Sequence, residues 1–467
     1  MMAADMNVNE LKKILVVGLG FRTGLAASNF LARRGVETVV TDSKSSAELA
    51  DIIARLDKNV RVITGKQEPA ILDEGFDCIV LSPGVPKKIP LIAAAVERNI
   101  PVLAEIELAW RFLKGSVIAI TGTDGKTTTT MLTHYILKEL GFHALVGGNV
   151  GIPLISIVDE SSDDTITVVE LSSFQLETID SFRPDAAAIL NITPDHLDRY
   201  DSMEDYFAAK MRITMNQTED DFLIYSLDDI ALSGAVKTSR AKTLAFSIDT
   251  RNGDIFYKED IIFFRDSGER RLFMKTKNMF LVGLHNIQNS MASILLVRSI
   301  LEKRGLELDY DRAVLACSSF KGMPHRMELL GVFQERTFLN DSKATTVGAV
   351  AMALRSLIVP GVIILGGRSK GDDYSRLSPY LRGAVRAIIL IGESKKEFAQ
   401  IFKEYNCVEA DTIDDAVVKA MGLSREGDAI LLSPACASFD MFKDYEERGD
   451  TFREAFRKLG SGELKWN

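Results

Sequence analysis

The chain has 467 residues, of which 46% are hydrophobic and 26% are charged, and at about 150 residues per domain this length favours three domains. Those fractions are ordinary for a globular protein and exclude a disordered or collagen-like chain. The formal net charge of −9 disfavours nucleic-acid binding, which needs clustered Lys and Arg.

The four cysteines lie far apart and form no CxxC pair, so the sequence indicates neither a disulfide framework nor a structural zinc site. The N-terminus has no apolar run of the kind found in a secretory signal, and no stretch reaches the roughly 18 apolar residues of a spanning helix. We therefore expect a reducing, cytoplasmic compartment and no membrane span. We also expect a monomer.

The first predicted segment opens with the apolar strand KKILVV and the glycines of GLGFRTG. A helix follows and ends near Gly35, a second strand closes at Asp42, and RVITG and DCIVLSPGV are later strands. Strands that alternate with helices predict a parallel sheet. The glycines are compatible with a dinucleotide site, a nucleotide-diphosphate site or a structural turn, because the same backbone geometry serves all three.

The second segment begins near Glu105. SVIAITGTDGKTTTT predicts a strand, a glycine loop and a helix, and TITVVELSS and DAAAILNIT predict two more buried strands. After about residue 220 the pattern changes to short alternating runs separated by turn residues: DFLIYS, TLAFSI, GDIFYK, DIIFFRD and RRLFMKT. We expect these runs to form a small antiparallel patch, followed by the long helix NIQNSMASILLVRSILEKRG.

The third segment begins near Pro324, where the strands RTFLND, GVIILGG, AIILIG and DAILLS alternate with helices in a second doubly wound unit. The sequence therefore predicts an α/β protein of three domains, at residues 1–105, 106–323 and 324–467. The first and last are Rossmann-like, and the central one is of the P-loop type with the antiparallel patch.

The phosphate-binding loop is the strongest single signal. Gly122 and Gly125 let the backbone turn its amides toward an anion, Lys126 would reach the terminal phosphates, and the Thr127 hydroxyl would ligate Mg²⁺. A helix that starts near Lys126 adds its positive end. The two glycines are separated by two residues rather than the four of the strict motif, so a turn that only redirects the chain is the alternative.

Three further residues are candidates for the same site. Glu170 ends a buried strand beside the loop, a common position for a Mg²⁺ ligand. His196 directly follows another strand, and both a metal-ligand role and a hydrogen-bonded structural role stay open. Lys210 lies on a predicted helix, and from the sequence alone we expect it to be solvated.

A set of motifs in a fixed order carries a family resemblance: TGTDGKTT, ELSSFQLE, TPDHLDRY, AAKMR, GLHNIQN, MPHR, NDSKAT and SPACASFD. Together they resemble the Mur ligases of peptidoglycan synthesis over nearly the whole chain. The resemblance implies a UDP-binding, an ATP-binding and an amino-acid-binding domain. It implies ATP-dependent amide formation through an acyl phosphate, with UDP-N-acetylmuramoyl-L-alanine and D-glutamate as substrates.

The resemblance also implies residue roles. The catalytic residues are Lys126, Glu170, His196 and a carbamylated Lys210, and the ligands of two Mg²⁺ ions are Thr127, Glu170, His196 and Lys210. The ATP contacts are Gly122, Thr123, Asp124, Gly125, Lys126, Thr127, Thr128, Asn286, Asn289, Arg326, Asp341 and Lys343. The UDP-substrate contacts are Thr23, Asp42, Ser43, Ser82, Gly84 and Asn149. The D-glutamate contacts are Thr345, Lys370, Ser438 and Tyr445. Helix capping or surface solvation is the alternative for these polar residues, and Ser438 could cap a helix from Asp440.

The chain departs from the family pattern at three places. GLGFRTG is one residue longer than expected, Arg368 interrupts the GGDGKG-like loop, and Lys44 stands where an Arg is expected. Three other functions stay open: a folylpolyglutamate synthase-like ligase, a dinucleotide-dependent oxidoreductase, and a non-catalytic nucleotide-binding regulator.

Overall fold

The computed structural model describes residues 8–194, 200–266, 269–281, 283–357 and 359–466. These residues form three sheets of five, nine and six strands. The chain packs into two compact units, Met1–Asn278 with Ile287–Cys317 and Met279–Asn286 with Ser318–Asn467. No helix in the described part of the chain combines the length and the apolar character needed to cross a membrane.

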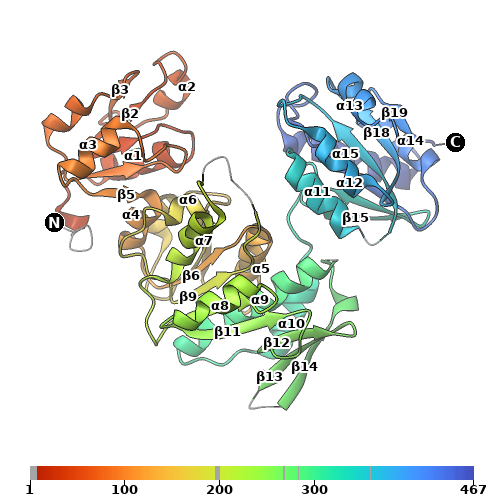
Figure 1. Cartoon of the computed structure of the whole chain (residues 1–467), viewed down its shortest axis with the longest axis horizontal. Coiled ribbons are helices and arrows are strands. Elements are labelled where there is room, and N and C mark those ends of the chain that lie inside the picture. Colours follow the sequence, from red (N-terminus) through yellow and green to blue (C-terminus); the bar gives the residue numbers. More distant parts are fainter. Residues whose placement is uncertain (1–7, 195–199, 267–268, 282, 358, 467) are drawn as a thin grey trace. The chain divides into compact units, whose positions relative to one another are not determined.

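The first sheet is parallel, with the order β3-β2-β1-β4-β5 of a mononucleotide-binding half-fold. Its strands and helices are the red and orange part of the chain in Figure 1. Side chains alternate between its faces: Ile14 and Val16 of β1 belong to one apolar cluster, and Leu15 and Val17 belong to another. The predicted alternation of strand and helix is confirmed. The elements are β1 (Lys13–Val17), α1 (Thr23–Arg33), β2 (Glu37–Asp42), α2 (Ala50–Ile53), β3 (Arg61–Thr64), β4 (Cys78–Leu81), α3 (Pro90–Glu97), β5 (Val102–Ala104) and α4 (Glu105–Phe112).

The second sheet has the order β14-β13-β12-β11-β10-β9-β6-β8-β7. Its strands are β6 (Ser116–Thr121), β7 (Ala144–Gly148), β8 (Ile166–Glu170), β9 (Ala186–Ile189), β10 (Phe222–Ser226), β11 (Lys242–Ser247), β12 (Ile255–Lys258), β13 (Ile261–Asp266) and β14 (Glu269–Lys275). The helices that follow its strands are α5 (Lys126–Glu139), α6 (Ser173–Leu176), α7 (Met203–Met211), α8 (Ile230–Ala235), α9 (Leu284–Lys303) and α10 (Tyr310–Ser319).

The prediction of an antiparallel patch is wrong for its first two strands. β10 and β11 continue the parallel sheet from β9, and antiparallel pairing begins only between β12 and β13. Leu223 and Ile224 of β10 are fully buried although they point to opposite faces. A strand that is covered on both faces is typical of a parallel interior, and this burial cannot be read from a short apolar run.

The third sheet has the order β15-β16-β20-β17-β18-β19, and only β15 is antiparallel to its neighbour. Val362 and Ile364 of β17 lie in one apolar cluster and Ile363 and Leu365 in another, so both faces are covered, as a doubly wound unit requires. The elements are β15 (Glu328–Phe333), β16 (Arg336–Asn340), α11 (Val347–Ser356), β17 (Gly361–Gly366), α12 (Ser378–Leu381), β18 (Val385–Ile391), α13 (Lys395–Ile401), β19 (Cys407–Glu409), α14 (Ile413–Leu423), β20 (Ala429–Leu432) and α15 (Tyr445–Ser461).

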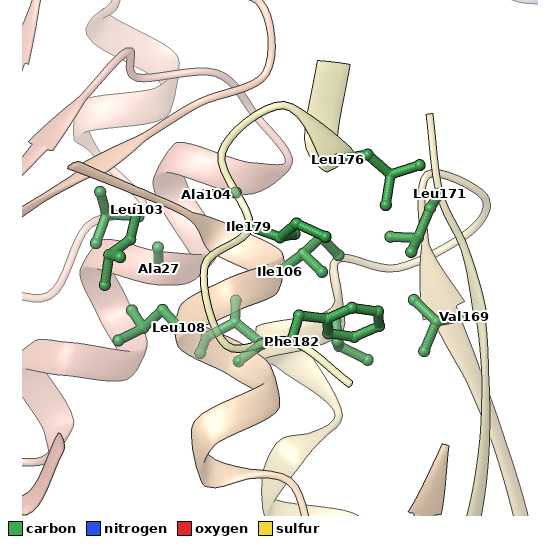
Figure 2. Close-up of a cluster of buried hydrophobic side chains, with 14 of the residues drawn as sticks. Ala27, Leu103, Ala104, Ile106, Leu108, Val169, Leu171, Leu176, Ile179 and Phe182 are labelled. Atoms are coloured by element: carbon green, nitrogen blue, oxygen red, sulfur yellow. The ribbon is translucent and has the colours of Figure 1, made fainter. Parts of the chain in front are cut away.

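One apolar cluster joins the first two sheets. Figure 2 shows Leu103 and Leu108 beside Ala27 of α1, with Ile106 and Phe182 nearer the second sheet. All five side chains are buried. Burial of this apolar surface stabilises the contact by about 25 cal/mol for each Å² removed from water.

Candidate active site

The loop between β6 and α5 depends on two glycines. Gly122 and Gly125 have φ values of +151° and +79°, which other residues rarely adopt. A Cβ atom on Gly125 would lie 2.3 Å from Oδ1 of Asn289. α5 begins at Lys126, as predicted. The first amides of an α-helix have no partner within it, so the loop and the helix start together present hydrogen-bond donors of the kind that bind anions.

Asn191 holds this loop in shape, and the sequence analysis did not single it out. Its Oδ1 accepts the amides of Asp124 and Thr123 at 2.8 and 3.1 Å, and its Nδ2 donates to the Asp124 carbonyl at 3.2 Å. The Asn191 carbonyl also accepts the Thr123 amide at 2.9 Å. A signal was present, because Asn191 is the polar residue that follows an apolar strand at the same sheet edge as the loop.

The ammonium of Lys126 lies on the loop backbone. Its Nζ donates to the carbonyls of Gly122 at 2.9 Å and Thr123 at 2.6 Å. Asn289 packs against the same loop and accepts a hydrogen bond from Thr129 Oγ1 at 3.2 Å. The structure therefore brings together the predicted loop residues and Asn289. Asn286 is also buried.

Glu170 ends β8, which pairs with β6 and so places the carboxylate beside the loop. The side chain is 2% exposed. Its Oε1 accepts from Asn149 Nδ2 at 2.8 Å, whereas Oε2 is buried and accepts no hydrogen bond from the described residues. A buried carboxylate oxygen without a donor is costly, and a hard cation satisfies it. With the buried hydroxyl-bearing Thr127 on α5, this donor set fits Mg²⁺.

Lys210 of α7 is buried, with 1% of its surface exposed. Its Nζ donates to the Gly122 carbonyl at 2.7 Å and lies 4.6 Å from the centre of the Tyr206 ring. Tyr206 itself approaches Thr123 Oγ1 with its hydroxyl at 3.2 Å. The expectation of a solvated lysine is therefore wrong, because the tertiary fold places this face of α7 against the phosphate loop.

His196 belongs to residues 195–199, which lie outside the described residues. The segment before it is attached to the phosphate loop: the Thr193 amide donates to Thr123 Oγ1 at 3.0 Å, and that hydroxyl donates to the Thr193 carbonyl at 3.1 Å. No group of three or more His, Cys, Asp or Glu side chains with metal-binding geometry occurs among the described residues.

The glycine loop of the first sheet is also tightly built. A Cβ on Gly24 would lie 2.1 Å from the Gly18 carbonyl, so α1 packs directly on the loop. Asp42 Oδ2 accepts the Leu19 amide at 2.7 Å, and Ser82 Oγ donates to the Gly18 carbonyl at 2.7 Å. Both side chains fix the loop from neighbouring strand ends. Thr23 is the first residue of α1, directly after this loop, and Ser43 and Gly84 lie in the connections that follow β2 and β4.

In the third sheet, Asp341 directly follows β16. Its Oδ2 accepts from Ser433 Oγ at 2.8 Å and its Oδ1 accepts from the Met327 amide at 3.1 Å. Burial raises the pKa of this carboxyl to about 7, against the opposing effect of the Arg326 charge. The Nε of Arg326 is buried and donates no hydrogen bond within the described part of the chain. The ammonium of Lys343 lies 5.2 Å from the centre of the Tyr445 ring.

The predicted D-glutamate residues lie on adjoining loops. Lys370 Nζ donates to Thr345 at its carbonyl, 3.0 Å, and at its Oγ1, 3.2 Å. Arg368 and Ala437 pair across an isolated β-bridge, which brings the loop of Lys370 to the segment of Ser438. The alternative role of Ser438 as the cap of a helix from Asp440 is wrong. The helix begins at Tyr445 and is capped by Asp444.

Arg448, which sequence reasoning missed, joins two of these segments. Its guanidinium is 1% exposed and donates to Ser342 Oγ at 3.0 Å, to the Ser342 carbonyl at 2.8 Å and to the Cys436 carbonyl at 3.2 Å. Burial lowers its pKa to about 10. Cys436 is a packed thiol, as expected, and burial raises its pKa. Nothing in the sequence of an amphipathic helix indicates which of its Arg residues will be buried, so this role could not be predicted.

Arg368, one of the departures from the family pattern, pairs with Glu393. Its Nε and Nη2 reach the two carboxylate oxygens at 3.1 and 3.0 Å. The hydrogen bond from Arg368 lowers the pKa of Glu393. The guanidinium is therefore held by a neighbouring loop of the same sheet.

Comparison with known proteins agrees with this geometry. Three family models match the chain: a MurD-like N-terminal domain at residues 12–104, the Mur ligase middle domain at 120–297, and the Mur ligase glutamate ligase domain at 325–436. The UDP-N-acetylmuramoylalanine–D-glutamate ligase of Geobacter sp. (strain M21) is 42% identical over 455 residues, covering 97% of this chain and 99% of that protein. The enzyme of the same name from Koribacter versatilis is 43% identical over 458 residues, covering 97% and 99%.

Solved structures show the same fold at low sequence identity. The MurF ligase from Thermotoga maritima in complex with ADP is 16% identical, with a TM-score of 0.57, and the match covers 97% of this chain and 100% of that chain. The UDP-N-acetylmuramate–alanine ligase from the same organism is 18% identical, with a TM-score of 0.56, covering 96% and 100%. The three family models and the relatives of more than 40% identity along nearly the full length show that the chain belongs to the Mur ligase family.

Proposed function

We propose that the protein joins D-glutamate to UDP-N-acetylmuramoyl-L-alanine by ATP-dependent amide formation, as a step in peptidoglycan precursor synthesis. One observation carries this proposal. At one sheet edge lie a glycine loop, a helix that begins at Lys126, and the carboxylate of Glu170. One oxygen of that carboxylate is buried and accepts no hydrogen bond from the described residues. These features belong to a chain 42% identical to a ligase named for this reaction.

The chemistry follows from the weakness of a carboxylate as an acyl donor, since an oxide ion is not a viable leaving group. The alanine carboxylate attacks the γ-phosphorus, the bond to the bridging oxygen breaks, and ADP leaves. The amine of D-glutamate then attacks the acyl phosphate, loses a proton, and phosphate departs from the tetrahedral intermediate. The α5 amides and Lys126 stabilise charge on the transferring group.

Mg²⁺ would neutralise the phosphate oxygens and the incoming carboxylate, which otherwise repel each other. Thr127 and Glu170 would hold one ion, and His196 with a carbamylated Lys210 would serve a second. The buried ammonium of Lys210 beside the loop supports the carbamylation hypothesis, because a carbamate would supply anionic oxygens at that position.

The remaining expected contacts are part of the same proposal. Asn289, Asn286, Arg326, Asp341 and Lys343 would contact ATP. Lys370 would be the counter-ion of the D-glutamate side chain, beside Thr345, Ser438 and Tyr445. Thr23, Asp42, Ser43, Ser82, Gly84 and Asn149 would contact the UDP substrate.

We also propose the domain boundaries 1–105, 106–323 and 324–467, a monomeric state and a cytoplasmic location. The free state of all four cysteines supports a reducing compartment.

The test is ADP release with UDP-N-acetylmuramoyl-L-alanine across a panel of D- and L-amino acids. We expect release that depends on D-glutamate and is lost in Lys126→Ala. A nicotinamide absorbance change without ADP release would favour an oxidoreductase, and a pteridine acceptor would favour a folylpolyglutamate synthase-like ligase. Nucleotide binding without phosphate release in any combination would favour a regulator.

A further inference from the structure

Arg22 lies inside the lengthened GLGFRTG loop that follows β1. Its side chain reaches the turn formed by residues 148–151 at the end of β7. Its Nη2 donates to the Gly151 carbonyl at 2.9 Å, to the Asn149 carbonyl at 3.3 Å and to the Gly148 carbonyl at 3.4 Å. Its Nη1 donates to the Asn149 carbonyl at 3.3 Å. One guanidinium therefore gathers three carbonyls of a four-residue turn, which its planar fork of donors suits.

That turn in turn orients Glu170. The Asn149 amide donates to the Glu170 carbonyl at 2.8 Å, and Asn149 Nδ2 donates to Glu170 Oε1 at 2.8 Å. Gly148 has a φ of +100°, and a Cβ there would lie 2.4 Å from the Glu170 carbonyl. The turn is thus in close contact with the end of β8, and a shift of its backbone moves the Asn149 amide group away from the carboxylate.

We propose that Arg22 is a positioning residue for the magnesium site: it fixes the 148–151 turn so that Asn149 presents Glu170 Oε2 to the metal ion. The inference rests on the proposed function. Neither the phosphate-loop motif nor the family motifs include Arg22. The proposal gives this residue a role at a distance from the reacting groups. It also gives the extra residue of GLGFRTG a purpose, since the longer loop carries the guanidinium across to the turn.

The expected size of the effect follows from the number of intervening contacts. Loss of a group that directly orients a metal ligand lowers metal affinity about 10- to 100-fold, and this is the expectation for Asn149→Ala. Arg22 acts through one more step, so we expect Arg22→Ala to raise the Mn²⁺ dissociation constant about fivefold. Arg22→Lys keeps one donor group and should lie between the wild type and the alanine variant.

The experiment titrates Mn²⁺ alone into each purified protein and follows free Mn²⁺ by electron paramagnetic resonance. The half-saturating Mg²⁺ concentration for ADP release, the KM for the UDP substrate and the melting temperature complete the set. Arg34→Ala is the matched control. Arg34 follows the other end of α1 and pairs with Asp159 of the second-sheet segment at 2.5 Å, and among the described residues no hydrogen bond of its side chain reaches the turn.

Weaker Mn²⁺ binding in Arg22→Ala, partial recovery in Arg22→Lys and wild-type binding in Arg34→Ala would support the proposal. Wild-type Mn²⁺ binding in Arg22→Ala would overturn it. It would also fail if only the KM for the UDP substrate rose, because Arg22 would then be a substrate contact, or if Arg34→Ala weakened binding equally. Because Mn²⁺ binding needs no turnover, it tests Arg22 separately from the reaction itself.

Discussion

Asn191→Ala offers the sharpest test of how the phosphate loop is built. The substitution removes three side-chain hydrogen bonds, from the amides of Thr123 and Asp124 and to the Asp124 carbonyl. At about 1 kcal/mol for each net hydrogen bond, the loop loses about 3 kcal/mol of support for its anion-binding shape. We expect kcat/KM for ATP to fall about 100-fold, since each 1.36 kcal/mol corresponds to a factor of about ten.

The assay is ADP release as a function of ATP concentration, combined with urea unfolding of each variant. Asn216→Ala is the matched control: its amide donates to the carbonyls of Asp180 at 2.8 Å and Phe182 at 3.0 Å, away from the loop. It should lower the free energy of unfolding and leave the ATP kinetics unchanged. If Asn191→Ala lost stability yet kept wild-type kcat/KM for ATP, the role assigned to Asn191 would be refuted.

Three further predictions concern the phosphate loop, Lys210 beside it, and Asp341 in the third sheet. Gly125→Ala should abolish detectable ATP binding by calorimetry, because its Cβ would lie 2.3 Å from Asn289 Oδ1 at a φ of +79°; near-normal affinity would contradict this. Lys210→Ala should lose activity while Lys210→Glu retains some, and normal turnover in the alanine variant would refute a carbamylated ligand. The pKa of Asp341 is raised to about 7, above its unfolded value of about 4, so its contribution to stability is largest at low pH and is lost as pH rises to 7. Urea unfolding of Asp341→Asn should therefore show its stability relative to wild type rising from pH 5 to pH 8, and a constant difference would exclude that linkage.

The sequence was sufficient where local patterns decide structure. The start of α5 at Lys126, the end of β8 at Glu170 and the strand–helix alternation of the first and third segments follow from periodicity and glycine positions. It was insufficient for β10 and β11, because a short apolar run does not reveal the direction of pairing. Their parallel pairing depends on cover from both faces.

The sequence by itself determined the residue types of the site and their order along the chain, since the glycine loop and the acidic strand end are local features. Only the tertiary structure decided which side chains meet. Lys210 is buried against the phosphate loop, and Asn191 is hydrogen-bonded to that loop. Arg22 donates hydrogen bonds to a turn more than 120 residues away in the chain. The reason is physical: hydrogen bonds and burial act over a few ångströms of space, and distances along the chain do not reveal them.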